Sequence, residues 1–154
     1  MADTMQGLKR THYCGEVLPS LIGETVVVTG WVQKTRDLGN LVFIDLRDRT
    51  GIVQLAFNDG TQREIFEKAA AARAEFVLMA KGLVRRRESV NTEIPTGEVE
   101  VYVDDLRVLA KSQTPPFEIV NDTNVKEELR LKYRYLDLRR PVMQNAIMMR
   151  HKIV

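Results

Sequence analysis

The sequence predicts an all-β domain with one helix, followed by a linker and the beginning of a further helical segment. Stretches of alternating apolar and polar residues, rich in β-branched and aromatic types, are separated by turn-forming residues. A single stretch with helical spacing follows the third of these strands. Near residue 110 the composition changes to polar residues and prolines, which indicates a domain boundary.

Three strands and two turns are expected in the first half of the domain. The strands are 25–34, 41–47 and 52–57, and all three are rich in residues that favour extended backbone. The turns that join the second strand to its neighbours, 37–40 and 48–51, contain the Asp, Asn and Gly residues that tolerate tight reversals. A meander of three antiparallel strands is therefore predicted.

The second half of the domain is expected to hold one helix and two more strands. Apolar residues recur at helical spacing over 65–73, and the alanine run there favours helix. Strands are expected at 76–86 and 98–109, joined by a polar loop at 89–97. Three strands, a helix and two strands is the order of the OB-fold, a five-stranded and partly open barrel.

The rest of the chain is predicted to leave the barrel. We expect a barrel at 1–110, a linker or hinge segment at 111–140, and the start of a truncated further domain at 141–154. Pro115 and Pro116 end the last strand. The final helical segment carries methionines and aliphatic residues with nothing to bury them against, which is typical of a chain cut where a second domain begins.

Composition limits the classes of function. The hydrophobic fraction of 44% in 154 residues suffices for a packed core, and a net charge of +2 means that any basic surface must be local. No apolar run approaches the roughly 18 residues that span a bilayer, so we expect no membrane contact. Cys14 is the single cysteine, which is typical of the reducing cytoplasm. His12 and His151 are too far apart to make a metal site with it, and we expect no catalytic or metal-binding residues.

The second predicted strand carries the features of a nucleic-acid surface. Its alternation turns Val42, Ile44 and Leu46 to one side and Phe43, Asp45 and Arg47 to the other. In the third strand Val53, Leu55 and Phe57 form the apolar row, which turns Gln54 outward. Rings stack on bases, amides read base edges and cations hold phosphates, so this face suits single-stranded nucleic acid.

Several residues have a second interpretation. Trp31 is expected in the core, as is usual for tryptophan in a small barrel. Arg36 lies beside the first turn, where it is either a solvated loop residue or part of the face. Lys81, Arg85 and Arg87 share one side of the fourth strand and could follow a phosphate backbone or form a solvated edge.

Two glutamates need a separate explanation. Glu98 and Glu100 alternate with valines, so they point outward together with Tyr102. Carboxylates repel phosphates unless they accept hydrogen bonds from a base. They are therefore either on the far side of the sheet or base readers, and the pattern leaves both open.

The chain resembles the bacterial aspartyl-tRNA synthetases over essentially its whole length from Arg10 onward, and two stretches carry the resemblance. The barrel part carries GWV at 30–32, RDLG at 36–39, FIDLRD at 43–48 and GIVQ at 51–54. The more diagnostic part is ELRLKYRYLDLRRP, which begins at Glu128 and is similar to the hinge before that family's class II catalytic domain. The resemblance implies that the barrel binds the anticodon loop of the aspartate tRNA.

The resemblance also implies roles for individual residues. Phe43 matches the ring that stacks on the central uracil, and Gln54 the amide that contacts the same region. Arg36 matches an arginine at the first anticodon base, which Glu100 is expected to read. Other positions matched near the anticodon loop are Arg87 and Asn91. Leu38 matches a specificity position, where leucine is associated with enzymes strict for the aspartate tRNA.

By the same resemblance, the full-length protein joins aspartate to tRNA with ATP and Mg2+ and is a homodimer. Its catalytic motifs would lie beyond Val154, so this chain is expected to bind tRNA without catalysis, with no cofactor, and as a monomer. Two other functions remain open from the residues alone. One is a free-standing OB-fold module for single-stranded nucleic acid without sequence preference, and the other is a structural barrel that binds protein.

Overall fold

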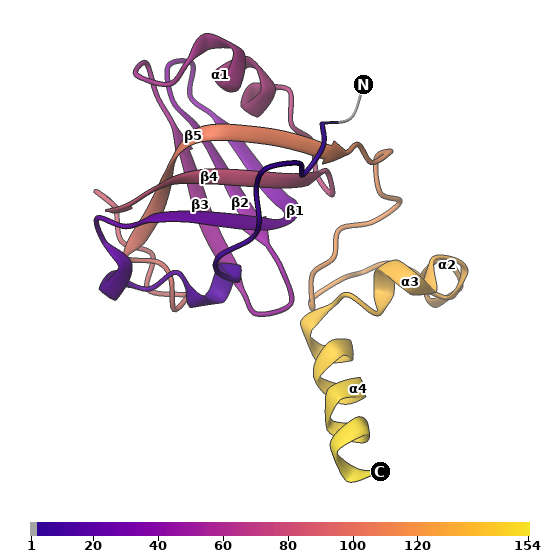
Figure 1. Ribbon diagram of the computed structural model, residues 1–154. Helices are drawn as coiled ribbons and strands as arrows, with labels where there is room; N and C mark the ends of the chain where they lie inside the picture. Colours follow the sequence, from indigo (N-terminus) through magenta and orange to yellow (C-terminus); the bar gives the residue numbers. More distant parts are fainter. Residues whose placement is uncertain (1–2) are drawn as a thin grey trace. The chain divides into compact units, whose positions relative to one another are not determined.

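The computed structural model describes residues 3–154, and the chain divides after Thr114 into two compact units. The first unit is a β-barrel with one α-helix, and the second contains three α-helices (Figure 1). The division falls within the segment where the sequence predicts a linker. Among the described residues, no helix is both long and apolar enough to cross a membrane.

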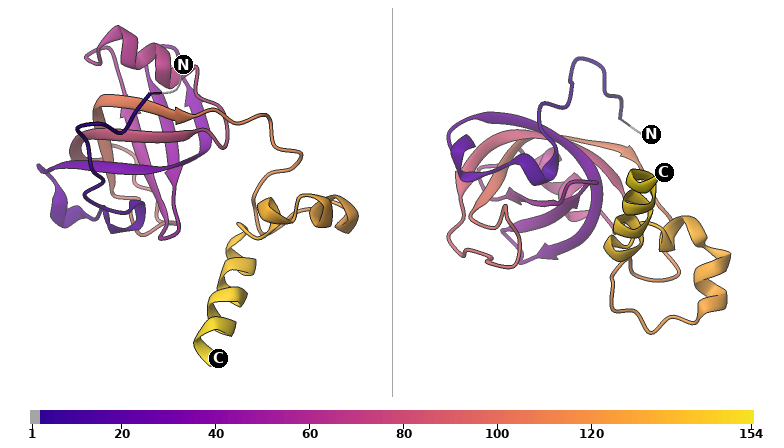
Figure 2. Two further views of the ribbon diagram at one scale, coloured as in Figure 1. Left: turned by 45° about the vertical axis from the view of Figure 1, so that its right-hand side comes forward. Right: turned by 90° about the horizontal axis from the view of Figure 1, so that it is seen from below.

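The first unit is a closed barrel of five strands, in agreement with the predicted fold class. Their order around the barrel is β1-β2-β3-β5-β4, so the chain crosses from β3 to β4 before β5 completes the ring (Figures 1 and 2). All pairs are antiparallel except β3 with β5, which run parallel. The strands are β1 Thr25–Asp37, β2 Val42–Arg47, β3 Ile52–Phe57, β4 Val77–Arg86 and β5 Val99–Ala110.

Strand β1 closes the barrel because both of its halves are paired. Its first half pairs with β4 and its second half with β2, and Trp31 takes part in both registers. The register with β2 shifts between Val32 and Lys34, and such a bulge bends a strand. At Gly30 a Cβ would collide with the backbone carbonyl of Arg47, so the sharp approach of β1 to β2 requires glycine there.

The barrel interior follows the predicted alternation. In β2 the side chains of Val42, Ile44 and Leu46 are fully buried, as are Val53 and Leu55 in β3. Helix α1, Arg63–Ala70, packs against this core through its buried apolar residues. The helix is shorter than the predicted 65–73, because the chain turns after it and enters β4.

Trp31 is the one core prediction for the barrel that is wrong. Before the bulge, the inward positions of β1 are the even-numbered ones, including Val26, Val28 and Val32, which belong to the core cluster. Trp31 therefore projects from the outer side of the strand and is only half-buried. Consecutive β-branched residues hide this alternation in the sequence.

The segment before β1 contains two short 3-10 turns, Cys14–Glu16 and Pro19–Leu21. The first turn is held by Asp48, whose carboxylate accepts a 2.7 Å hydrogen bond from the backbone N–H of Cys14. Burial alone would raise the pKa of Asp48, but hydrogen bonds from Thr50 and Cys14 outweigh it and lower that pKa.

The second unit has a small core of its own. Phe117, Ile119 and Leu136 are buried there, with Val125 and Tyr133 packed against them. The predicted helical pattern at 125–135 is divided into two short helices, and the third begins at Pro141, as predicted. The helices are α2 Glu127–Lys132, α3 Arg134–Asp137 and α4 Pro141–Ile153.

Candidate nucleic-acid interface

A hollow of about 410 Å3 lies on the outer face of the barrel, over β1, β2, β3, β5 and the end of β4. Its floor and walls combine rings, an amide, a carboxylate and guanidinium groups. The residues that carry its chemistry are Arg36, Phe43, Gln54, Arg85, Glu100 and Tyr102. Strands far apart in the sequence thus bring five of the predicted anticodon-binding residues into one hollow, namely Arg36, Phe43, Gln54, Arg87 and Glu100.

Strand register arranges these residues in two neighbouring rows across the sheet. The first, here called the ring row, runs from Arg36 through Phe43 and Ala56 to Tyr102. Alanine in the middle of this row leaves the two rings without a bulky side chain between them. Phe43 is half-buried, as its outward position in β2 predicts.

The second row, here called the polar row, runs from Asp45 through Gln54 and Glu100 to Arg85. On β2, β3 and β5 its residues are two positions away from those of the ring row, so both rows face the same side of the sheet. The sequence left open whether Glu100 lies on the far side of the barrel. The register places it on the face that carries Phe43.

Hydrogen bonds join the two rows. The Nη2 atom of Arg36 donates to Oε1 of Gln54 at 2.9 Å, and Nε2 of Gln54 donates to Oε2 of Glu100 at 2.8 Å. Arg36 also contacts Asp45 at 3.2 Å. Arg36 is therefore part of β1 and of this face, and the interpretation as a solvated loop arginine is wrong.

Gln54 is more enclosed than its outward orientation predicts. Its side chain points to the outer face, yet only 4% of the residue is exposed. Neighbours on the other strands cover it, and Arg36 and Glu100 fix which end of the amide is the donor. A base that contacts Gln54 must therefore replace one of these two partners or approach from above the amide.

Electrostatics make Glu100 a strong hydrogen-bond acceptor. Burial raises the pKa of its carboxyl, although the hydrogen bond from Gln54 and the charges of Arg87 and Arg85 act in the opposite direction. Glu100 is paired with Gln54 on β3, and on its other side it is paired with Arg85 on β4. An amino or imino group of a base could supply the hydrogen bonds that a buried carboxylate requires.

At the other end of the ring row, sequence reasoning missed a pair of contacting residues. The guanidinium carbon of Arg85 lies 4.2 Å from the centroid of the Tyr102 ring. The Tyr102 hydroxyl donates a hydrogen bond to Oδ1 of Asn58. The alternation of β5 already turned Tyr102 outward beside Glu100, but only the pairing of β4 with β5 brings Arg85 over its ring.

Two predicted site residues lie outside the hollow. Asn91 is in the loop between β4 and β5, where its side chain accepts a 3.0 Å hydrogen bond from the backbone of Glu93. Leu38 is in the turn between β1 and β2 and is 68% exposed. The roles of all the predicted site residues, inside and outside the hollow, remain predictions.

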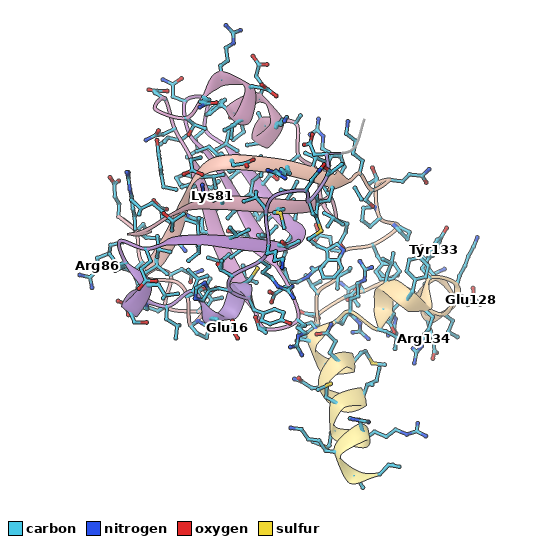
Figure 3. The ribbon with its side chains drawn as sticks, in the orientation of Figure 1. Glu16, Lys81, Arg86, Glu128, Tyr133 and Arg134 are labelled. Atoms are coloured by element: carbon cyan, nitrogen blue, oxygen red, sulfur yellow. The ribbon has the colours of Figure 1, made fainter. Side chains whose placement is uncertain are left out.

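The basic residues of β4 do not form one continuous patch. Arg85, Arg86 and Arg87 line the hollow, whereas Lys81 does not. Figure 3 shows Lys81 near the middle of β4 and Arg86 at its far end. Arg86 also contacts Glu98 at 3.5 Å, which distinguishes this exposed glutamate from Glu100 in the hollow.

A second hollow, of about 280 Å3, lies elsewhere on the barrel and includes Trp31. Arg10 and Arg49 both lie over the ring of Tyr13, at 3.9 and 4.7 Å from its centroid. This is the same kind of contact as that of Arg85 with Tyr102, at a distinct site. Among residues 3–154 there is no cluster of three or more potential metal-binding His, Cys, Asp or Glu residues.

The barrel matches a known family over more than half of the chain. The family model is described as "OB-fold nucleic acid binding domain", of the tRNA anti-codon type, and it matches residues 26–109. The chain belongs to this family. The match extends over all five strands of the OB-fold domain and includes the hollow with both of its rows.

Relatives of this OB-fold protein include bacterial ligases. The aspartate–tRNA(Asp/Asn) ligase of Caldanaerobacter subterraneus subsp. tengcongensis is 54% identical, over 99% of this chain and 26% of its own length. The aspartate–tRNA ligase of Limosilactobacillus fermentum is 53% identical, over 95% of this chain and 25% of its own length. The chain thus spans about a quarter of the curated relatives it matches.

A solved structure shares this fold. The asparaginyl-tRNA synthetase of Pyrococcus horikoshii, solved with asparaginyl-adenylate, superposes with a TM-score of 0.73 and 35% identity. The superposition covers 86% of this chain and 29% of that one.

Proposed function

We propose that the OB-fold domain recognises the anticodon of the aspartate tRNA, as the N-terminal part of an aspartate–tRNA ligase. The observation that carries this proposal is the hydrogen-bonded connection between Arg36, Gln54 and Glu100 beside the half-buried ring of Phe43. It is supported by the likeness of nearly the whole chain to the first quarter of ligases named for this tRNA.

In the proposed mechanism, unstacked anticodon bases settle on the outer face of the barrel. The central uracil stacks on Phe43 with its edge near Gln54, while Arg36 and Glu100 contact the first base. Arg87 and Asn91 act close to the anticodon loop. A wrong base is rejected because it leaves an enclosed polar group such as the Glu100 carboxylate without a partner, which costs about 1–3 kcal/mol.

The activity of the larger protein forms part of the proposal. It would activate aspartate with ATP and Mg2+, esterify tRNA, act as a homodimer and reside in the cytoplasm. The present chain would bind tRNA as a monomer without catalysing the reaction. We assign none of its residues to ATP or to the metal.

Leu38 supports a further proposal about tRNA choice. The relatives include ligases named for both the aspartate and asparagine tRNAs and ligases named for the aspartate tRNA alone. This chain is 53–54% identical to one ligase of each kind, so overall sequence identity does not indicate which tRNA specificity it has. We propose the strict type, because Leu38 occupies the exposed turn where strict enzymes carry leucine.

The test is a titration of the whole chain with anticodon stem-loops that differ only in the central base. We expect replacement of the uracil to weaken binding sharply, and Phe43→Leu to weaken binding of the cognate loop by about 1–3 kcal/mol, the value of one stacked base. Leucine keeps the apolar bulk and removes the ring. Tyr13→Leu is the matched control, because it removes a half-buried ring outside the hollow.

The alternatives give different results in the same titration. A single-strand-binding module without sequence preference would bind all the loops equally well. A barrel that binds only protein would bind none of them. Either result would overturn anticodon recognition.

A further inference from the structure

We infer that Arg85 and Tyr102 form a second stacking platform, which receives the base whose edge meets Glu100. The inference rests on the proposed function and extends it to a pair of residues that the likeness to the synthetases does not single out. Phe43 would then stack on one base of the anticodon. The platform, which lies on the other side of Ala56, would stack on the adjacent base.

The separation of the two rings requires separate bases. Phe43 is on β2 and Tyr102 on β5, with β3 between them, and the register places them opposite the same residue, Ala56. Neighbouring strands are about 4.8 Å apart, so the two ring-bearing backbones are roughly 10 Å apart. One base cannot cover both positions, and Ala56, although buried, has no bulky side chain that would fill the hollow between the two rings.

Arg85 lies over the ring of Tyr102. Its guanidinium lies against the Tyr102 ring at 4.2 Å, while Arg85 itself is exposed and Tyr102 is half-buried. The ring therefore supports the guanidinium from the barrel side. Bases of single-stranded RNA stack on guanidinium planes as well as on aromatic rings. The positive charge of Arg85 also favours the approach of phosphate.

The tyrosine ring is fixed before any ligand arrives. Its hydroxyl donates to the side chain of Asn58, at the turn that follows β3. Gly60 in the same turn packs closely on it, because a Cβ there would lie 3.0 Å from the hydroxyl oxygen. A platform that is already ordered loses little side-chain freedom on binding.

Glu100 identifies which base the platform receives. Arg85 is the register partner of Glu100 on β4, and Tyr102 is two residues from Glu100 on the same face of β5. A base stacked on Arg85 therefore has its edge toward the Glu100 carboxylate. In the proposed function this is the first anticodon base.

The experiment uses the whole chain and the cognate anticodon stem-loop. We expect Tyr102→Leu to weaken binding about ten-fold, in the range for loss of one stacked base, and Arg85→Lys to weaken it although the charge is kept. Tyr102→Phe keeps the ring under Arg85 and should have a much smaller effect. Tyr13→Leu is the control, since it removes a ring with the same kind of arginine contact outside the hollow.

Abasic stem-loops then assign the base. If the platform stacks the first base, Tyr102→Leu and Arg85→Lys cause no further loss with a loop that is abasic at the first position. Both should still weaken binding of a loop that is abasic at the third position. The thermal midpoint of each variant, followed by circular dichroism, shows whether the barrel has remained folded, and Arg85→Lys provides the test if Tyr102→Leu unfolds.

Each result is decisive. If Phe43→Leu weakens binding while Arg85→Lys and a folded Tyr102→Leu do not, the platform is wrong and anticodon recognition stands. Loss that persists with the first-position abasic loop also overturns the assignment. If all loops bind equally and Phe43→Leu has no effect, the proposed function fails, and the platform fails with it.

Discussion

At the scale of single residues, Glu100 shows a conflict between folding and recognition. Its carboxyl is partly buried, and burial raises its pKa because the charged form is poorly solvated. Gln54 supplies one hydrogen bond to it. A partly buried carboxylate of this kind lowers the stability of the folded barrel. It is also well suited to accept hydrogen bonds from a base.

We therefore predict that Glu100→Gln changes the pH dependence of stability. Burial raises the pKa of Glu100 in the folded barrel above its ordinary value, so at pH values between the two the folded protein retains a proton that the unfolded chain has already lost. Wild-type stability should fall, relative to the variant, as pH rises through the unfolded and then the folded pKa. Urea unfolding between pH 4 and 7 should show the relative advantage of the variant growing with pH.

The same variant should bind the cognate stem-loop more weakly, because the amide presents a donor as well as an acceptor. Glu24→Gln is a suitable control, as it makes the same chemical change at an exposed residue outside the hollow. A difference in stability that is constant with pH would contradict the account given for Glu100.

At the scale of elements, the carboxylate of Asp137 links the helices of the second unit through hydrogen bonds and ion pairs. Asp137, at the end of α3, is fully buried and accepts hydrogen bonds from Arg140 at 2.8 Å and Arg134 at 3.0 Å. Arg130 of α2 lies 3.7 Å away, and Arg140 precedes the first residue of α4. Helices this short are unstable alone, so this contact and the small apolar core determine whether they form.

We predict that Asp137→Asn loosens the second unit and leaves the barrel intact. Removal of the charge leaves the buried guanidinium of Arg140 without its anion, a loss of about 3–5 kcal/mol for a buried pair. Hydrogen exchange should show faster exchange in α2 and α3, with unchanged protection in β1 to β5. Glu128→Gln is the matched control, an exposed acid on α2, and equal exchange in the two variants would contradict the prediction.

At the scale of the whole molecule, the chain contains two separate hydrophobic cores. The buried residues of the barrel core lie between Cys14 and Leu106, and those of the second core between Phe117 and Leu136. The hollow is lined entirely by residues of the barrel. The barrel core and the hollow are therefore both built from residues before Thr114.

We predict that a chain ending at Thr114 folds and binds the anticodon stem-loop as tightly as the 154-residue chain. Circular dichroism should show a cooperative thermal transition, and titration should give the same affinity. An unfolded product, or a folded barrel that no longer binds the loop, would show that the second unit contributes to the site.

The sequence predicted the parts of this molecule that depend on local alternation and failed where distant strands meet. The inward rows of β2 and β3, and with them the outward position of Phe43, follow from period-two patterning. The enclosure of Gln54 could not be predicted, because its neighbours come from β1 and β5. The contact of Arg85 with Tyr102 likewise requires the register between β4 and β5.

Closure of the five strands into a ring restricts the kind of molecule that the barrel can hold. An open sheet offers an unpaired margin to which an extended peptide can attach through its main chain. Here every strand has a neighbour on both sides, although β3 and β5 pair over only three residues, so a ligand is held mainly by side chains on the outer face. Planar molecules with distinct hydrogen-bonding groups at their edges meet this requirement better than extended peptides do.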